Sequence, residues 1–185
     1  MADPGKSIAV ARPAATAVIL RDGRQGLEVF MVVRHHEIDF ASGALVFPGG
    51  KVDGLDEDPA WSEFVASPVG PLERAFVVAA ARETFEEAGL MLARRAGEEG
   101  LMEANAAHRL VEMYRARLAA GGVTFLDVVR SENLCLAADL MVPFAHWITP
   151  QHQPKRFDTH FLLVSAPVEQ LGAHDGGESV EGFWI

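Results

Sequence analysis

Three acidic side chains, Glu83, Glu86 and Glu87, are spaced so that a helix would carry them on one face. Residues 72–88 contain no Gly or Pro and are rich in Ala and Glu, which predicts that this helix forms. Gly89 follows directly, and glycine often ends a helix because it adopts the left-handed conformation without a Cβ penalty. The sequence therefore predicts three neighbouring carboxylates in the last turn of one helix.

This acidic cluster is unfavourable for an isolated helix on two counts. Like charges at these spacings repel by about 0.2–0.5 kcal/mol per pair. The helix dipole also disfavours anions in the last turn, where Lys or Arg would be stabilising. A divalent cation would convert the repulsion into ligation, and an all-oxygen ligand set favours Mg²⁺ or Mn²⁺ over zinc. We therefore interpret the cluster as a metal site, with a solvated acidic helix face as the alternative.

A second feature precedes the helix. The apolar residues 44–46 lead into Gly49 and Gly50, which predict a turn where the backbone can approach a ligand closely. The helix itself reads Arg82-Glu83-Thr84-Phe85-Glu86-Glu87-Ala88-Gly89-Leu90. Together these stretches resemble the box of the Nudix hydrolase family, which ends Arg-Glu-apolar-any-Glu-Glu-any-Gly-apolar. The helical half matches with one deviation, Thr84 at an apolar position.

The first half of the box differs from the family pattern. Gly50 precedes Arg82 by 32 positions where the family has 14, so 18 residues are inserted, and we place them within 53–71. Arg74 occupies the position of the outer Glu, and only its neighbour Glu73 could replace that acid. A box split in this way resembles the Nudix subgroup of coenzyme A and acyl-CoA diphosphatases. Residues 40–50, 147–150 and 156–159 also resemble that subgroup.

The resemblance implies a role for each residue of the acidic cluster. Glu86 and Glu87 would be the core ligands of Mg²⁺ or Mn²⁺, and Glu83 a third ligand or the general base. Arg82 lies four positions before Glu86, so we expect an ion pair that orients this ligand rather than an ordinary surface pair. These four residues are the catalytic candidates.

Further candidates lie outside the helix. The carbonyl of Gly50 could ligate the ion, and family members often add an acid from outside the box, for which we select Glu178 over its neighbour Glu181. A polar surface loop is an equally good interpretation of Glu178. Substrate phosphates require local positive charge in such an acidic chain. The substrate-binding candidates, each with an ordinary surface or structural role as its alternative, are Arg34, Gly49, Gly50, Lys155 and Arg156.

The resemblance implies a Mg²⁺- or Mn²⁺-dependent diphosphatase that cleaves the pyrophosphate bond of a nucleoside diphosphate derivative. Coenzyme A or acyl-CoA is the favoured substrate. ADP-ribose, NADH and a nucleoside triphosphate remain open, because the box does not specify the loops that build the substrate pocket. A noncatalytic ligand-binding module on the same fold is the alternative, although such a module would be expected to lose the acidic ligands.

Composition bounds the other properties of this 185-residue chain, which we take as one domain, residues 1–185. A net charge of −10 argues against nonspecific binding to nucleic acid or acidic membranes. The single Cys135 excludes an internal disulfide and fits a reducing compartment. We find no signal peptide and no apolar run of membrane-spanning length, so we expect a cytoplasmic protein. Dimers are common in the resembled family, which makes a homodimer an expectation.

The remaining pattern predicts a mixed α/β (α+β) fold, an α/β/α sandwich around a mixed central sheet. Residues 1–12 form a poorly ordered lead. We expect a hairpin from residues 14–20 and 27–33, further strands at 90–92, 134–144, 157–166 and 180–185, and helices at 60–66, 101–120 and 125–129. The seven histidines show no metal-ligand spacing, so we treat them as structural or surface residues, and we place Trp147 and Phe157 in the core.

Overall fold

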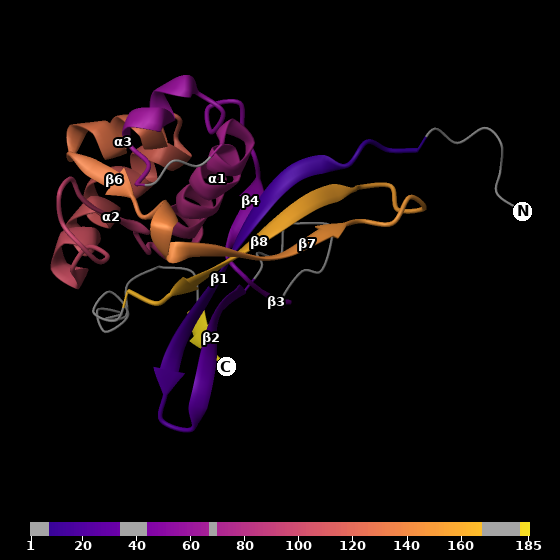
Figure 1. Cartoon of the computed structure of the whole chain (residues 1–185), viewed down its shortest axis with the longest axis horizontal. Coiled ribbons are helices and arrows are strands. Elements are labelled where there is room, and N and C mark those ends of the chain that lie inside the picture. Colours follow the sequence, from indigo (N-terminus) through magenta and orange to yellow (C-terminus); the bar gives the residue numbers. More distant parts are fainter. Residues whose placement is uncertain (1–7, 34–43, 67–69, 168–181) are drawn as a thin grey trace, which may run out of the picture.

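The computed structural model describes residues 8–33, 44–66, 70–167 and 182–185 (Figure 1). The predicted hairpin is present as β1 (Arg12–Gly23) and β2 (Gly26–Val33), which pair antiparallel. Gly26 has a φ of 140°, a conformation that favours glycine, and this explains the tight turn between the two strands. The lead predicted at 1–12 lies partly outside the described residues.

The central sheet is mixed, as predicted. Its strand order is β3 (Leu45–Val46), β2, β1, β8 (Phe157–Ser165) and β7 (Met141–Ile148). Two short strands pair beside this path, β4 (Gly49–Lys51) on β1 and β9 (Gly182–Trp184) on β2. The β1–β8 pair is parallel and the other pairs are antiparallel. A separate two-stranded sheet joins β5 (Ala93–Arg95) to β6 (Leu134–Leu136).

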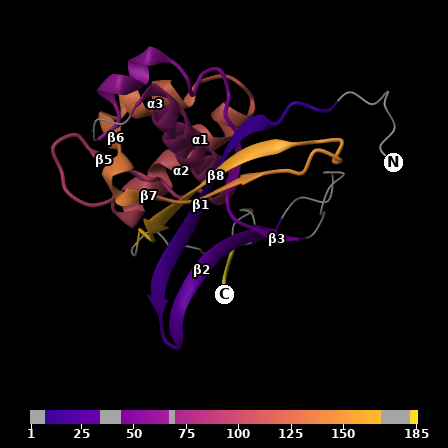
Figure 2. The ribbon, with the colours of Figure 1, turned by 45° about the vertical axis from the view of Figure 1, so that its right-hand side comes forward.

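The α-helices of the described residues gather at one end of the molecule, as the two views show (Figures 1 and 2). They are α1 (Pro71–Ala88), α2 (Ala104–Ala119) and α3 (Phe125–Ser131), and two short 3₁₀ helices span Pro59–Glu63 and Ala138–Leu140. Helix α1 packs on β1 and β4, and α2 packs on α1. None of the helices in the described part of the chain combines the length and hydropathy that a membrane span requires.

Small side chains bring α1 close to the sheet. Ala79, Ala80 and Ala81 are fully buried, and Ala15 and Ala17 of β1 are equally inaccessible. Alanine occupies little space, so the helix backbone can lie near the strands and still exclude water. The predicted helix is therefore confirmed, and its core-facing side combines these alanines with larger buried residues such as Phe76 and Phe85.

The region before α1 is anchored rather than loosely attached. Trp61 is 1% exposed, contacts Phe125 with ring centroids 5.8 Å apart, and donates its indole N–H to the Leu55 carbonyl at 3.0 Å. Val65 forms an isolated bridge with Leu136. The expectation that this segment packs onto the domain is confirmed, although its short helix is a 3₁₀ helix at Pro59–Glu63 rather than a helix at 60–66.

Several strand predictions need correction. Residues 90–92 are buried but not a strand, and the strand begins at Ala93. The predicted strand 134–144 is two strands, β6 and β7, because a 3₁₀ turn at Ala138–Leu140 separates them. Apolar residues can be buried in a connection as well as in a strand, and local pattern does not distinguish the two cases.

Two further corrections concern residues near the site. The glycine pair is not a turn, because Gly49 and Gly50 lie in β4 and pair with Thr16 and Ala15 of β1. Trp147 is 71% exposed on β7, so its placement in the core was wrong. An exposed strand face carries such a residue when no layer of the described structure covers it.

Candidate functional site

Helix α1 ends as the sequence predicts, at Gly89 in the left-handed conformation with φ 69°. The Gly89 N–H donates to the Phe85 carbonyl at 3.0 Å. The side chain of Arg115, from α2, donates to the carbonyl oxygens of Glu86 at 2.7 Å and Glu87 at 2.9 Å. These carbonyls have no partner within the helix, so a cation from a second helix stabilises the negative end of α1. The sequence alone did not indicate this role for Arg115.

Arg82 is the centre of the polar network beside the acidic cluster. Its Nη1 contacts Glu83 Oε1 at 2.9 Å and Glu86 Oε2 at 3.2 Å, which confirms the ion pair expected from the spacing. Its principal partner is Asp56, which accepts from Nε and Nη2 at 2.9 Å each, and Nη2 also donates to the Lys51 carbonyl at 3.0 Å. The guanidinium therefore connects the segment before α1, strand β4 and two carboxylates of the helix.

The charge state of this pair follows from its surroundings. Asp56 is 1% exposed and the side chain of Arg82 is 15% exposed. Burial lowers the pKa of Arg82, but the hydrogen bonds and charge of Asp56, with the charges of Glu83 and Glu86, outweigh it and raise that pKa above its usual range. Arg82 is thus a permanent cation held in one orientation by a bidentate carboxylate.

The backbone of β4 meets the other side of the acidic cluster. The Gly49 N–H donates to Glu87 Oε2 at 3.0 Å. A Cβ atom at Gly50 would lie 2.3 Å from Glu83 Oε1, so the absence of a side chain there lets the carboxylate reach the strand. The glycine pair thus performs the close approach that the sequence indicated, but from a strand.

Replacing Gly50 by Ala is expected to reduce activity with little loss of stability. The new methyl group would displace the carboxylate of Glu83, which is the mobile end of a side chain rather than backbone. We expect the hydrolysis that the resemblance implies to fall by about 10²-fold or more, the range for misplacing a catalytic group by about 1 Å. The kcat and the melting temperature of Gly50→Ala measure the two effects.

Two other glycine-to-alanine variants serve as controls for this prediction. Gly54→Ala adds a methyl group where nothing lies within 4 Å, so it should leave both quantities unchanged. At Gly49 the new Cβ would lie 2.5 Å from the Ala15 carbonyl oxygen, so Gly49→Ala should destabilise the fold instead. Equal thermal destabilisation by Gly50→Ala and Gly49→Ala would contradict the proposed role of Gly50.

The acidic cluster is short of positive charge. Burial raises the pKa of Glu86, Glu83 raises it further, and Arg82 offsets only part of this effect. The cluster is also held apart, because Arg82 binds Glu83 and Glu86 while the Gly49 N–H binds Glu87. Its three carboxylates do not form a group whose ligand atoms all lie within 4.8 Å of one another. A divalent cation would supply the missing charge, and all-oxygen donors would suit Mg²⁺ or Mn²⁺.

Thr84, at the apolar position of the motif, is fully buried in α1. Within the described structure its hydroxyl oxygen has no hydrogen-bond partner. Threonine has nearly the same shape as valine, so Thr84 fills the space that an apolar residue would fill. The cost is one buried hydroxyl group without a hydrogen bond.

The remaining predicted site residues divide into those outside the described residues and those away from the acidic cluster. Arg34 and Glu178, with Glu181, His35 and His36, lie outside the described residues. Glu73 is in the first turn of α1, about 15 Å along the helix axis from Glu83 at 1.5 Å per residue, and its part as a substitute for the outer acid stays a prediction.

The two basic candidates lie at the turn between β7 and β8. Lys155 is exposed, and Arg156 donates to the carbonyl oxygens of Thr149 at 2.9 Å and Ala9 at 2.7 Å. His160 and Gly50 are both in register with Ala15 of β1, so the three residues form one row across the sheet. Arg156 is four residues before His160 and therefore lies about 13 Å along the strand direction from this row. Its contacts with backbone carbonyls are those of a residue that holds the turn, and its role toward substrate stays a prediction.

Comparison with known proteins places the chain among relatives with this fold. Residues 65–185 match the family described as the NUDT19 Nudix domain. The chain is 26% identical over 159 residues to "Putative nudix hydrolase 7" of Caenorhabditis elegans, an alignment that covers 85% of this chain and 46% of the relative. The chain therefore spans about half the length of that curated relative.

A solved structure shows the same arrangement of elements. The crystal structure of a NUDIX hydrolase from Alicyclobacillus acidocaldarius superimposes with a TM-score of 0.65 at 25% sequence identity. The match covers 96% of this chain and 80% of the other chain. The mixed α+β fold with its mixed sheet is thereby confirmed.

Proposed function

Because this chain belongs to the Nudix hydrolase family, we propose that it is a Mg²⁺- or Mn²⁺-dependent diphosphatase acting on a nucleoside diphosphate derivative. One observation carries the proposal. Glu83, Glu86 and Glu87 share the last turn of α1, where Arg82 and the backbone of β4 hold their carboxylates. A structural helix end would not retain three anions in this position.

The residues present fit a divalent cation. Glu86 and Glu87 would hold it, with Glu83 and the Gly50 carbonyl as the further candidate oxygen donors. When bound, such an ion neutralises charge on a pyrophosphate and lowers the pKa of a coordinated water. Removal of the ion with EDTA is expected to abolish hydrolysis, and added Mg²⁺ or Mn²⁺ to restore it.

Glu83, Arg82 and Gly49 each have a different role in the proposed reaction. Glu83 is the general base, because its Oε1 is fixed by Arg82 Nη1 at 2.9 Å and can accept the proton of an attacking water. Arg82 is a positioning residue, since its guanidinium is engaged by Asp56 and by two glutamates. Gly49 holds Glu87 through its N–H, which orients a ligand from the side opposite to Arg82.

For the substrate we propose coenzyme A or acyl-CoA, cleaved to 3′,5′-ADP and a phosphopantetheine product. The support is sequence resemblance: the long separation of Gly50 from Arg82, and the stretches 147–150 and 156–159, resemble the subgroup that acts on these compounds. The family match spans residues 65–185 and so includes the helix and both stretches. The pocket for the remainder of the substrate would be formed by loops, which differ most among members of a fold.

A substrate panel tests this proposal. The protein is incubated with CoA, acetyl-CoA, ADP-ribose, NADH or dATP in Mg²⁺, in Mn²⁺ and in EDTA, and the products are separated chromatographically. Hydrolysis of CoA or acetyl-CoA to 3′,5′-ADP, lost in EDTA, is the expected result. Turnover of ADP-ribose, NADH or dATP alone would retain the diphosphatase and overturn the CoA assignment. Metal binding without turnover of any compound would favour a ligand-binding module.

A further inference from the structure

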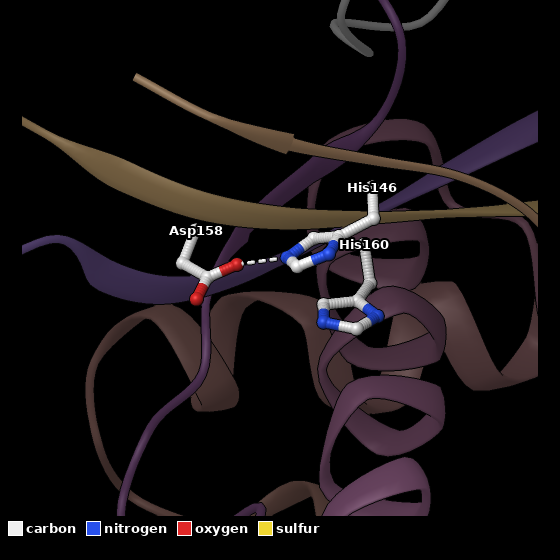
Figure 3. A group of neighbouring side chains, drawn as sticks. All are labelled: His146, Asp158 and His160. Carbon is white, nitrogen blue, oxygen red and sulfur yellow. Dashed lines mark hydrogen bonds and ion pairs between the residues drawn. The ribbon is translucent and has the colours of Figure 1, made fainter. Parts of the chain in front are cut away.

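A second group of metal-ligating side chains lies on the sheet, away from the carboxylates of α1. His146 of β7 is paired in register with His160 of β8, and Asp158 lies two residues before His160 (Figure 3). Side chains two residues apart on a strand share a face, so the three project from the same side of the sheet. Each offers one ligand atom, and these atoms all lie within 4.8 Å of one another.

Aromatic packing fixes the rings of this group. The imidazoles of His146 and His160 are stacked with centroids 4.2 Å apart and an interplanar angle of 28°. On its other side His160 stacks on Phe76 of α1, with centroids 3.9 Å apart and an angle of 21°. His146 Nε2 contacts Asp158 Oδ1, as the dashed line in Figure 3 shows. Ligands held by packing and hydrogen bonding lose little freedom when an ion binds.

The group is separate from the acidic cluster in both chemistry and position. Gly50, beside Glu83, is in register with Ala15 of β1, and Ala15 is in register with His160. Two strand spacings therefore separate the backbones of Gly50 and His160, about 10 Å. The acidic cluster offers only oxygen atoms, whereas this group offers two imidazole nitrogens and one carboxylate oxygen.

We propose that His146, Asp158 and His160 form a second cation site that takes a first-row transition-metal ion, with Zn²⁺ as the best fit. Imidazole nitrogens suit Zn²⁺ and related ions, while Mg²⁺ strongly prefers oxygen donors. The side chains of His146 and Asp158 are 47% and 36% exposed, so an ion reaches the site from solvent. Three protein ligands leave a fourth position for water or another small ligand.

An ordinary surface ion pair would involve only His146 and Asp158. The third ligand distinguishes the two interpretations, because His160 is not a member of that ion pair and yet lies in the same group, held by Phe76. Metal binding requires all three donors in one place, which is what the register of β7 and β8 provides.

The test is Zn²⁺ binding by the full chain in saturating Mg²⁺, which occupies the acidic cluster. Isothermal titration gives stoichiometry and affinity, and the visible spectrum of bound Co²⁺ reports nitrogen ligation without any measure of activity. We expect one tight equivalent in the wild type, weakened by about 10-fold or more in both His146→Ala and Asp158→Asn. Circular dichroism and thermal melting confirm that each variant is folded.

Three control variants make the result specific. His108→Ala removes an exposed histidine of α2 that pairs with Glu112, and it should bind Zn²⁺ as the wild type does. The Glu86→Gln, Glu87→Gln variant should also retain the ion. The His35→Ala, His36→Ala variant removes the adjacent histidine pair of the sequence and should retain it too. Unchanged affinity in His146→Ala and Asp158→Asn, or loss in any control instead, would overturn the proposal.

Discussion

Replacing both Glu86 and Glu87 by Gln is expected to reduce hydrolysis by at least about 10²-fold, because a catalytic cation contributes several kcal/mol of transition-state stabilisation and its ligands would be lost. Glutamine keeps the size of each side chain and removes the charge that a divalent cation requires. The measurements are kcat with the preferred substrate and the affinity for Mn²⁺. Both should fall together, because the two residues act through the ion.

The same variant should not lose stability without metal. Burial raises the pKa of Glu86, with Glu83 contributing and Arg82 opposing. A carboxyl group with a raised pKa stabilises the fold below its unfolded pKa, and that contribution is lost as the pH rises through the folded pKa. At neutral pH the amide removes this unfavourable charge. In EDTA the variant should therefore melt no lower than the wild type.

A surface substitution provides the control for this prediction. Glu112 of α2 is 66% exposed at its side chain, so Glu112→Gln removes a carboxylate that is not part of the acidic cluster. It should leave kcat and Mn²⁺ affinity at wild-type values. Wild-type turnover by the Glu86→Gln, Glu87→Gln variant would show that the acidic cluster takes no part in the reaction.

Replacing Arg82 by Ala is expected to destabilise the fold by about 3–5 kcal/mol, the range observed when one partner of a buried ion pair is removed. Asp56 would remain as a carboxylate that is 1% exposed, without the two hydrogen bonds that Arg82 donates. Activity should fall as well, because Glu83 and Glu86 lose the cation that holds them. Urea unfolding measures the first effect and steady-state kinetics the second.

A double-mutant cycle separates the ion pair from general disruption. The Arg82→Ala, Asp56→Ala variant removes both charges, so its loss of stability should be smaller than the sum of the two single losses. Arg21→Ala removes the Arg21–Glu28 pair, whose side chains are 36% and 27% exposed, and the contact of the guanidinium with the Trp184 ring at 3.9 Å, and it should change stability by about 2 kcal/mol or less. Equal effects of Arg82→Ala and Arg21→Ala would show that the Asp56 pair is unimportant.

Local sequence was sufficient where a residue's role depends on its neighbours along the chain. The helix that carries Glu83, Glu86 and Glu87, its end at Gly89 and the Arg82–Glu86 pair all follow from spacings of three or four residues. Helix geometry fixes these relations whatever the helix packs against. The hairpin of β1 and β2 was predictable for the same reason, since both strands adjoin one short turn.

Partners distant in sequence were missed. Asp56 lies 26 residues before Arg82, and Arg115 lies 29 residues after Glu86, so nothing in the local pattern of either residue marks the contact. Asp56 stands in the acidic run 56–58, which looks like an ordinary solvated loop. The segment reaches the site because Trp61 is buried against α3, and that packing is a tertiary property.

The sequence by itself thus determined the acidic helix turn, the family that it resembles and the preference for a hard cation. Only the tertiary structure decided which groups surround that turn: the bidentate Asp56, the capping Arg115 and the β4 backbone. It also brought His146 and His160 together, 14 residues apart, because strand register places side chains opposite one another. Helix spacing is encoded in the local chain, whereas register and layer packing depend on the whole hydrophobic core.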